Sequence, residues 1–104
     1  MDERATFRRA DQPGEAPCLL IAGEIDLAVA GEFASAVNDL LQAADGAATI
    51  DLRAVTFFNS TGIGVLCDAA AGAGRRGVTL VVRPSDHVRR TLEITGLTET
   101  FDLR

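Results

Sequence analysis

Lysine is missing from this chain of 104 residues, and all ten of its basic residues are arginines. Without a lysine amine, the protein cannot form a Schiff base with a carbonyl substrate. It also cannot supply the lysine of a GxxxxGK phosphate-binding loop. The sequence therefore excludes Schiff-base catalysis and lysine-dependent nucleotide binding.

Concentrated positive charge is missing as well. The formal net charge is −5, and arginine pairs occur only at three separate places, Arg8-Arg9, Arg75-Arg76 and Arg89-Arg90. Direct nucleic-acid binding needs clustered charge that neutralises phosphates. We therefore expect no nucleic-acid partner.

Long apolar runs are also absent, since none approaches the ~20 residues of a membrane-spanning helix. Residues 1–4 are mostly charged and no apolar stretch follows them, unlike a signal peptide. The sequence therefore predicts a cytoplasmic protein that does not enter a membrane.

Residues for metal or nucleophilic chemistry are few. Cys18 and Cys67 lie in apolar segments and form no CxxC motif, which favours buried free thiols. His87 is the only histidine, and a triad with Ser60 and an aspartate is improbable because no GxSxG elbow occurs. We expect no metal, no cofactor and no hydrolase activity.

The length suits a single domain over residues 1–104 with one core. Apolar patterning and turn residues indicate the element order β-β-α-β-α-β-α. The predicted fold is α/β, a mixed sheet of four to five strands with packed helices and right-handed crossovers. Expected strands are residues 5–9, 18–22, 47–52 and 78–82, expected helices are 27–44, 61–75 and 84–94, and residues 98–104 form a last element of unassigned type.

The rest of the chain is organised around residues 49–66. A strand is followed by a connection that buries Val55, Phe57 and Phe58, and then by the helix-start residues Asn59-Ser60-Thr61-Gly62. The helix contains many glycines, which suggests that it lies very close to the sheet. Four of its residues should face the sheet beside Leu20, Ile50 and Leu80, namely Ile63, Leu66, Cys67 and Ala70.

Two polar positions that are distant in sequence are expected to meet. Asp26 and Asn59-Ser60 each follow a strand that should be parallel to its neighbour. The carboxyl ends of parallel strands gather at one edge of an open α/β sheet, where binding sites form. Ser60 also lies near the free N–H groups of a helix start, which favour a phosphate. The simpler alternative is that Ser60, or Thr61, is only the helix cap.

The same residues carry a family resemblance. The run D-L-R-x-V-x-F-F-N-S-T-G-I-G, residues 51–64, resembles the signature of the STAS domain. It is most similar to that of bacterial anti-sigma factor antagonists, which are phosphorylated on the serine that Ser60 matches. Residues 23–26 and 95–97 resemble the two flanking motifs of the family. One position departs from the pattern, because Asn59 stands where the family usually has aspartate.

The resemblance implies a regulatory binding protein that catalyses nothing. The unmodified protein would bind an anti-sigma factor, usually an ATP-dependent serine kinase, and so release a sigma factor for transcription. Phosphorylation of Ser60 would separate the pair, and a phosphatase would restore the free form. Ser60 is the expected phosphorylation site and Thr61 the runner-up. The expected partner surface comprises Asp26, Asn59, Ser60, Thr61, Gly62 and Ile63.

Asn59 leaves alternatives open. A neutral amide can neither act as a base nor bind magnesium as aspartate does, so phosphorylation would be slower or absent. Asn59 is otherwise a turn residue that tolerates unusual backbone angles. A STAS subunit of a transport assembly and a non-phosphorylated STAS scaffold therefore remain candidates, as does a small nucleotide-binding enzyme.

Overall fold

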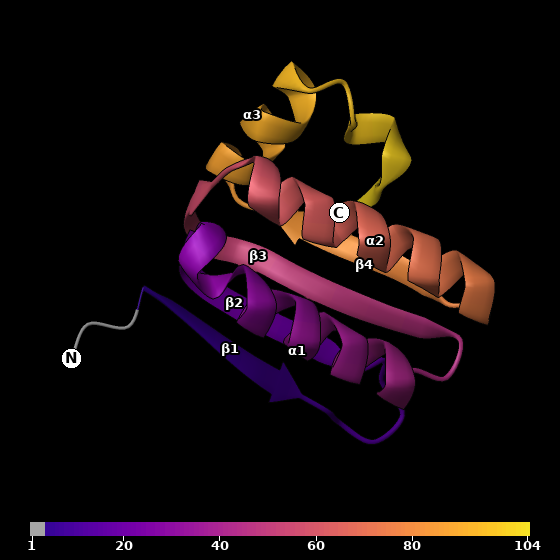
Figure 1. Ribbon diagram of the computed structural model, residues 1–104. Coiled ribbons are helices and arrows are strands. Elements are labelled where there is room, and N and C mark those ends of the chain that lie inside the picture. The colour runs from indigo at the N-terminus through magenta and orange to yellow at the C-terminus, as the bar shows by residue number, and fades with distance from the viewer. Residues whose placement is uncertain (1–3) are drawn as a thin grey trace.

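A five-stranded sheet in the order β1-β2-β3-β4-β5 forms the centre of the protein (Figure 1). The computed structural model describes residues 4–104. β1 pairs antiparallel with β2, and the other neighbours pair in parallel. The strands are β1 (Ala5–Ala10), β2 (Cys18–Ile25), β3 (Ala47–Phe58), β4 (Thr79–Pro84) and β5 (Asp102–Leu103).

In the described part of the chain, three α-helices accompany the sheet: α1 (Ala30–Ala43), α2 (Ser60–Arg76) and α3 (Asp86–Ile94). Two short 3₁₀ turns, η1 (Leu27–Val29) and η2 (Thr98–Thr100), precede α1 and β5. In Figure 1, α1 and α2 lie side by side across one face of the sheet, and α3 lies beyond them. The predicted mixed α/β fold and element order are confirmed, and β5 resolves the unassigned last element.

The core lies between this helix pair and the sheet. Alternate residues of β2 and β3 point to the helices, as the two-residue period of a strand requires. They pack on the inward stripes of α1 and α2, and none of these side chains is appreciably exposed. The fully buried set includes Leu19, Ile21, Ile50, Leu52, Phe33, Leu40 and Leu66.

The predicted connection after residue 52 is wrong, because β3 continues as a strand to Phe58. Two register shifts against β2 place extra residues in β3. The first follows Asp51, whose carboxylate accepts hydrogen bonds from the N–H of Arg53 and from its guanidinium. Val55 and Phe58 are buried as expected, but Phe57 is 41 % exposed. Hydrogen bonding to β2 therefore extends the strand beyond residue 52.

The apolar run of residues 18–22 predicts a strand that is buried on both faces, but the structure covers only one of them. Leu19 and Ile21 point into the core, whereas Leu20 is half-buried on the opposite face. Leu20 therefore does not lie beside α2. The strand extends to Ile25, which is fully buried. A continuous apolar run in the sequence does not show whether one face or both faces of the strand are covered.

The helix α2 contacts the core through a slightly different stripe from the predicted one. Ile63 and Leu66 are buried as expected, but Ala69 and Ala73 are buried more deeply than Cys67 and Ala70. Most of the interior glycines do not bring α2 close to the sheet. A Cβ at Gly64 or Gly74 would meet no atom within 4 Å.

Residues 72–77 have the spacing of a GxGxxG motif. Phosphate binding by this motif needs a helix N-terminus, whereas these glycines lie at the C-terminal end of a helix. They lie in the last turns of α2, and Gly77 ends it in the left-handed conformation at φ 67°. A helix C-terminus presents carbonyl groups and partial negative charge, which disfavour phosphate. This run therefore ends the helix at Gly77 and does not bind phosphate.

We expect Leu66→Ala to lower the free energy of unfolding by ~2–5 kcal/mol, because Leu66 is fully buried between α2 and the sheet. Urea denaturation followed by circular dichroism would measure the change. The exposed Asp68 on the same helix is the control position, and Asp68→Ala should shift stability by less than about 0.5 kcal/mol. A loss below that value for Leu66→Ala would contradict the packing described.

Candidate functional site

The carboxyl ends of β2 and β3 lie side by side. Ile25 and Phe58 are direct partners in the parallel pairing, and both are buried. Asp26 and Asn59 are the next residues of the two strands, so the structure brings together the positions that strand-end geometry predicted. α3 packs against this edge, since the hydroxyl of Thr91, which donates to the carbonyl of His87 over 2.9 Å, also lies 3.4 Å from the carbonyl oxygen of Phe58.

Asn59 is the N-cap of α2. Its backbone is extended at φ −120°, and its Oδ1 accepts a hydrogen bond of 3.1 Å from the N–H of Thr61. Neither Ser60 nor Thr61 is the cap, so that alternative is wrong. Asn59 is also not a turn residue in an unusual backbone conformation. An amide oxygen serves this purpose as well as a carboxylate does, since asparagine and aspartate rank alike as caps.

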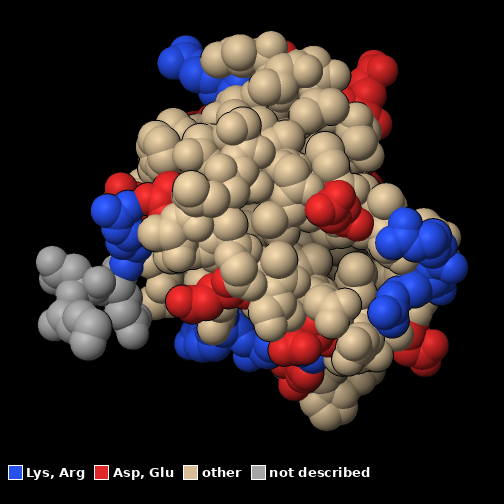
Figure 2. All heavy atoms as spheres, in the orientation of Figure 1, with Lys and Arg blue, Asp and Glu red and all other residues tan. Residues whose placement is uncertain are grey.

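Ser60 is exposed and is the first residue of α2. The N–H groups of Ser60 and Gly62 belong to the same first turn and have no partner within the helix. The first turn contains no acidic residue, and Arg75 and Arg76 complement the dipole at the other end. Figure 2 shows few charged side chains over the start of α2. An added negative charge on Ser60 would therefore face favourable helix-end donors.

Asp26 caps the turn that leads into α1. Its Oδ1 accepts from the N–H of Ala28 over 3.0 Å, and its other oxygen pairs with the guanidinium of Arg4. The side chain remains 21 % exposed. Asp26 therefore orders the entry to α1 while part of its carboxylate faces solvent beside Asn59.

The remaining residues expected at this edge differ in accessibility. Thr61 is half-buried, whereas Gly62 and Ile63 are buried. A Cβ on Gly62 would lie 2.6 Å from the ring of Phe58, so only glycine permits this approach of α2 to β3. Gly62 and Ile63 hold the first turn against the strand end and leave contact with a partner to their exposed neighbours.

Two exposed apolar side chains at the same edge were not anticipated from the sequence. Leu27 directly follows Asp26 and is 78 % exposed, and Phe57 lies two residues before Asn59. The ring of Phe57 packs against that of His87, with centroids 5.7 Å apart. A signal for Leu27 existed, because it lies outside the apolar stripe of the predicted helix. No sequence signal marked Phe57 as exposed, because an aromatic residue next to a buried aromatic is itself expected to be buried.

The described residues show no arrangement for metal binding. Among residues 4–104, no group of three or more His, Cys, Asp or Glu side chains is placed to hold an ion. Cys18 and Cys67 are free and half-buried. Within the same range, no helix is both long enough and apolar enough to cross a membrane.

Comparison with known proteins identifies the family. Residues 9–104 match the family model described as the Mlab, STAS domain. The chain belongs to the STAS family. It is 35 % identical over 98 residues to the anti-sigma-F factor antagonist RsfB of Mycobacterium tuberculosis, covering 94 % of this chain and 80 % of the relative. It is 34 % identical over 88 residues to the anti-sigma-B factor antagonist of Listeria monocytogenes, covering 83 % and 76 %.

A solved structure supports the same placement. The STAS domain described here superimposes on an anti-sigma factor antagonist from Mycobacterium paratuberculosis with a TM-score of 0.80. The two are 31 % identical, and the match covers 95 % of this chain and 84 % of the other. The expected STAS fold is thereby confirmed, and the homologues of the domain are anti-sigma factor antagonists.

We expect Gly62→Ala and Gly74→Ala to have opposite effects on stability. The new methyl group at residue 62 must displace the buried ring of Phe58, which should cost about 1–3 kcal/mol. The methyl group at residue 74 meets open space, so higher helix propensity should stabilise the protein by up to ~1 kcal/mol. Thermal unfolding measures both. Equal effects would mean that Gly62 does not hold α2 against β3.

Proposed function

We propose that this STAS domain is an anti-sigma factor antagonist whose binding is switched off by phosphorylation of Ser60. The observation that carries the proposal is an exposed serine on the first turn of a capped helix, beside the end of a neighbouring strand. The names of relatives at 34 % and 35 % identity support it. The protein would act in the cytoplasm as a binding partner and not as a catalyst.

The proposed cycle has three steps. The unmodified domain binds an anti-sigma factor, and the sigma factor held by that protein is released. The anti-sigma factor, acting as a serine kinase, transfers a phosphoryl group to Ser60, and the complex separates. A phosphatase acting on phospho-Ser60 returns the domain to its binding form.

The physics of the switch follows from the position of Ser60. A phosphate adds about −1.5 to −2 charges. The first-turn N–H groups and the helix dipole accommodate them, so the fold persists. A partner surface packed over Ser60 would not offer such donors to the phosphate. One like-charge contact at ~4 Å costs about 4 kcal/mol at a surface-like dielectric. Affinity would then fall roughly a thousandfold.

The proposed partner surface has a polar centre and an apolar margin. Asp26, Asn59, Ser60 and Thr61 supply the centre, and Leu27 and Phe57 supply exposed apolar area beside it. Buried apolar and aromatic anchors carry most of the energy of protein interfaces. Gly62 and Ile63 contribute by holding the first turn of α2 and not by direct contact.

We expect the cognate anti-sigma kinase to phosphorylate Ser60, with Thr61 at most a minor site because it is half-buried. Ser60→Ala should fold, bind and resist modification, since it removes only the acceptor hydroxyl. The stability loss should be small, because Asn59 and not Ser60 caps the helix. Ser60→Asp should fold and bind poorly. Mass spectrometry after incubation with kinase and ATP would identify the phosphorylated residue. Phosphate on Thr61 alone, or no phosphate despite proven binding, contradicts the proposal.

Asn59→Asp serves as the matched variant in the same assay. Both residues cap helices, so stability should change little. If a carboxylate normally orients the hydroxyl or the metal of the kinase, the variant should be phosphorylated faster. An unchanged rate would assign Asn59 to capping alone and leave the Ser60 proposal intact. Asn59→Ala, by contrast, should lose about 1 kcal/mol of stability.

We expect Asp26→Ala to weaken binding of the anti-sigma factor more than Arg89→Ala or Arg90→Ala does. Asp26 lies at the proposed surface, whereas both arginines are exposed residues of α3, which packs through Val88 and Leu92. Titration calorimetry with the purified partner provides the comparison. Loss of binding in the two arginine variants with full binding by Asp26→Ala would place the surface on α3.

A STAS subunit of a transport assembly, or a non-phosphorylated scaffold, is the second candidate. The observation that favours it is Asn59, whose neutral amide caps α2 without offering a carboxylate to a kinase-bound metal. Co-purification with a membrane ATPase, in place of a soluble kinase, would support this alternative.

A further inference from the structure

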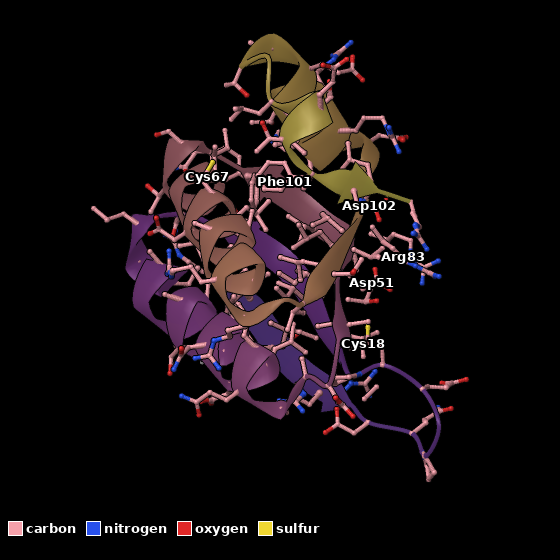
Figure 3. All side chains as sticks on the ribbon, turned by 90° about the vertical axis from the view of Figure 1, so that its right-hand side faces the viewer. Cys18, Asp51, Cys67, Arg83, Phe101 and Asp102 are labelled. Atoms are coloured by element: carbon pink, nitrogen blue, oxygen red, sulfur yellow. The ribbon has the colours of Figure 1, made fainter. Side chains whose placement is uncertain are left out.

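Within residues 4–104, one face of the sheet has no helix over its middle. Figure 3 shows α1 and α2 on one side of the sheet and the side chains of Cys18, Asp51 and Arg83 pointing to the other side. Leu20 and Ala22 of β2 are half-buried on this second face, and Ala54 of β3 is exposed there. Sheets with parallel strands are usually covered on both faces. The described residues therefore leave apolar sheet surface without a covering layer.

The uncovered face is hollowed. A depression of about 680 Å³ lies over β1, β2 and β3, lined by Thr6, Arg8, Leu20 and Ala54 among others. A second depression of about 440 Å³ extends toward β4 and reaches Arg83. The two share Leu20, Asp51 and Arg53, so they adjoin, and together they are called the trough.

Three arginines, Arg8, Arg53 and Arg83, and two carboxylates, Asp51 and Glu15, line the trough, so its net charge is +1 although the whole chain is acidic. Asp51 is its buried carboxylate, only 6 % exposed, and Arg53 binds it with a shortest contact of 2.7 Å. Burial alone would raise the pKa of Asp51, but the hydrogen bonds and charge of Arg53, with the charge of Arg83, hold it below its usual value. Arg8 and Arg83 are exposed and form no salt bridge within residues 4–104. Arg8 and Arg83 are therefore available to pair with carboxylates of a partner, and Glu15 offsets only one of their two charges.

A second copy of the chain is a poor occupant for this trough. A symmetric pair of such faces would bring like surfaces together and oppose arginines to arginines. The outward face of α1 is acidic but polar, with Glu32, Asn38 and Asp39 exposed, and it offers no apolar stripe. The occupant needs apolar area and negative charge together.

We propose that this trough is a second docking surface, for an amphipathic acidic helix of another protein. The apolar stripe of the helix would lie on Leu20, Ala22 and Ala54, and its flanking carboxylates would pair with Arg8 and Arg83. Helix docking in a groove is a common mode of peptide recognition, with anchors spaced at i, i+3 or i+4, and i+7. Complementary charge at the margins sets the orientation and rejects basic helices.

This surface is separate from the Ser60 edge. The trough follows the middle of β2 and β3, around Leu20 and Asp51, whereas Asp26 and Asn59 lie beyond the strand ends. Two partners can therefore bind at once, and the helix would remain bound when Ser60 is phosphorylated. The inference stands independently of the proposed switch.

The test uses a synthetic helical peptide of about 18 residues, ~27 Å long as a helix. It carries leucines at i, i+3, i+4 and i+7 and glutamates flanking them, and a control peptide has lysines in place of the glutamates. Amide shifts of the isotope-labelled protein are followed by NMR during titration. We expect the acidic peptide to shift the middle residues of β1, β2 and β3, and the basic peptide to bind far more weakly.

Matched variants make the result decisive. Arg8→Gln combined with Arg83→Gln should weaken binding of the acidic peptide roughly tenfold, through loss of two partly exposed charge pairs. Arg75→Gln combined with Arg76→Gln removes equal charge from the end of α2 and should leave the affinity unchanged. Equal weakening by both pairs, equal binding of both peptides, or shifts confined to α1, α2 or the Ser60 edge would overturn the proposal. Ser60→Asp should bind the peptide as the unaltered protein does.

Discussion

The parallel pairing of β2 with β3 is the interaction on which the candidate site depends. Hydrogen bonds between these strands place Ile25 beside Phe58, and so Asp26 beside Asn59. A slip of one residue would turn the buried residues of a strand to its opposite face, so the core enforces the register. Where β3 gains extra residues against β2, Asp51 binds Arg53 and satisfies the displaced backbone. Precise placement of the strand ends thus follows from burial in the middle of the sheet.

The end of β3 is also the start of α2, which explains how the domain can tolerate a new charge. Asn59 ends the strand in an extended conformation and caps the helix with its amide oxygen. Gly62 lets the first turn approach the ring of Phe58, so the turn is held by packing on one side and is open to solvent at Ser60. A phosphate there would interact with helix-end donors and leave the core undisturbed.

The sheet has two faces with different roles. One is covered by α1 and α2 and supplies most of the core, while the other carries the positive trough. Although the chain as a whole has a net charge of −5, Arg8, Arg53 and Arg83 gather around this uncovered face. The proposed Ser60 surface lies at the edge between the faces. This division allows a small domain to present two surfaces without changing its core.

The sequence alone determined the order of the elements, because apolar periodicity, caps and Gly77 are local signals. It also indicated that Asp26 and Ser60 meet, since strand ends gather by topology. Three features were decided only by the tertiary structure. Pairing with β2 extends β3 to Phe58, and the packing of α1 and α2 on a single face leaves Leu20 uncovered. Arginines from β1, β3 and β4 converge there only once the strands are assembled. No local pattern encodes these features, because each depends on which surfaces distant segments leave exposed.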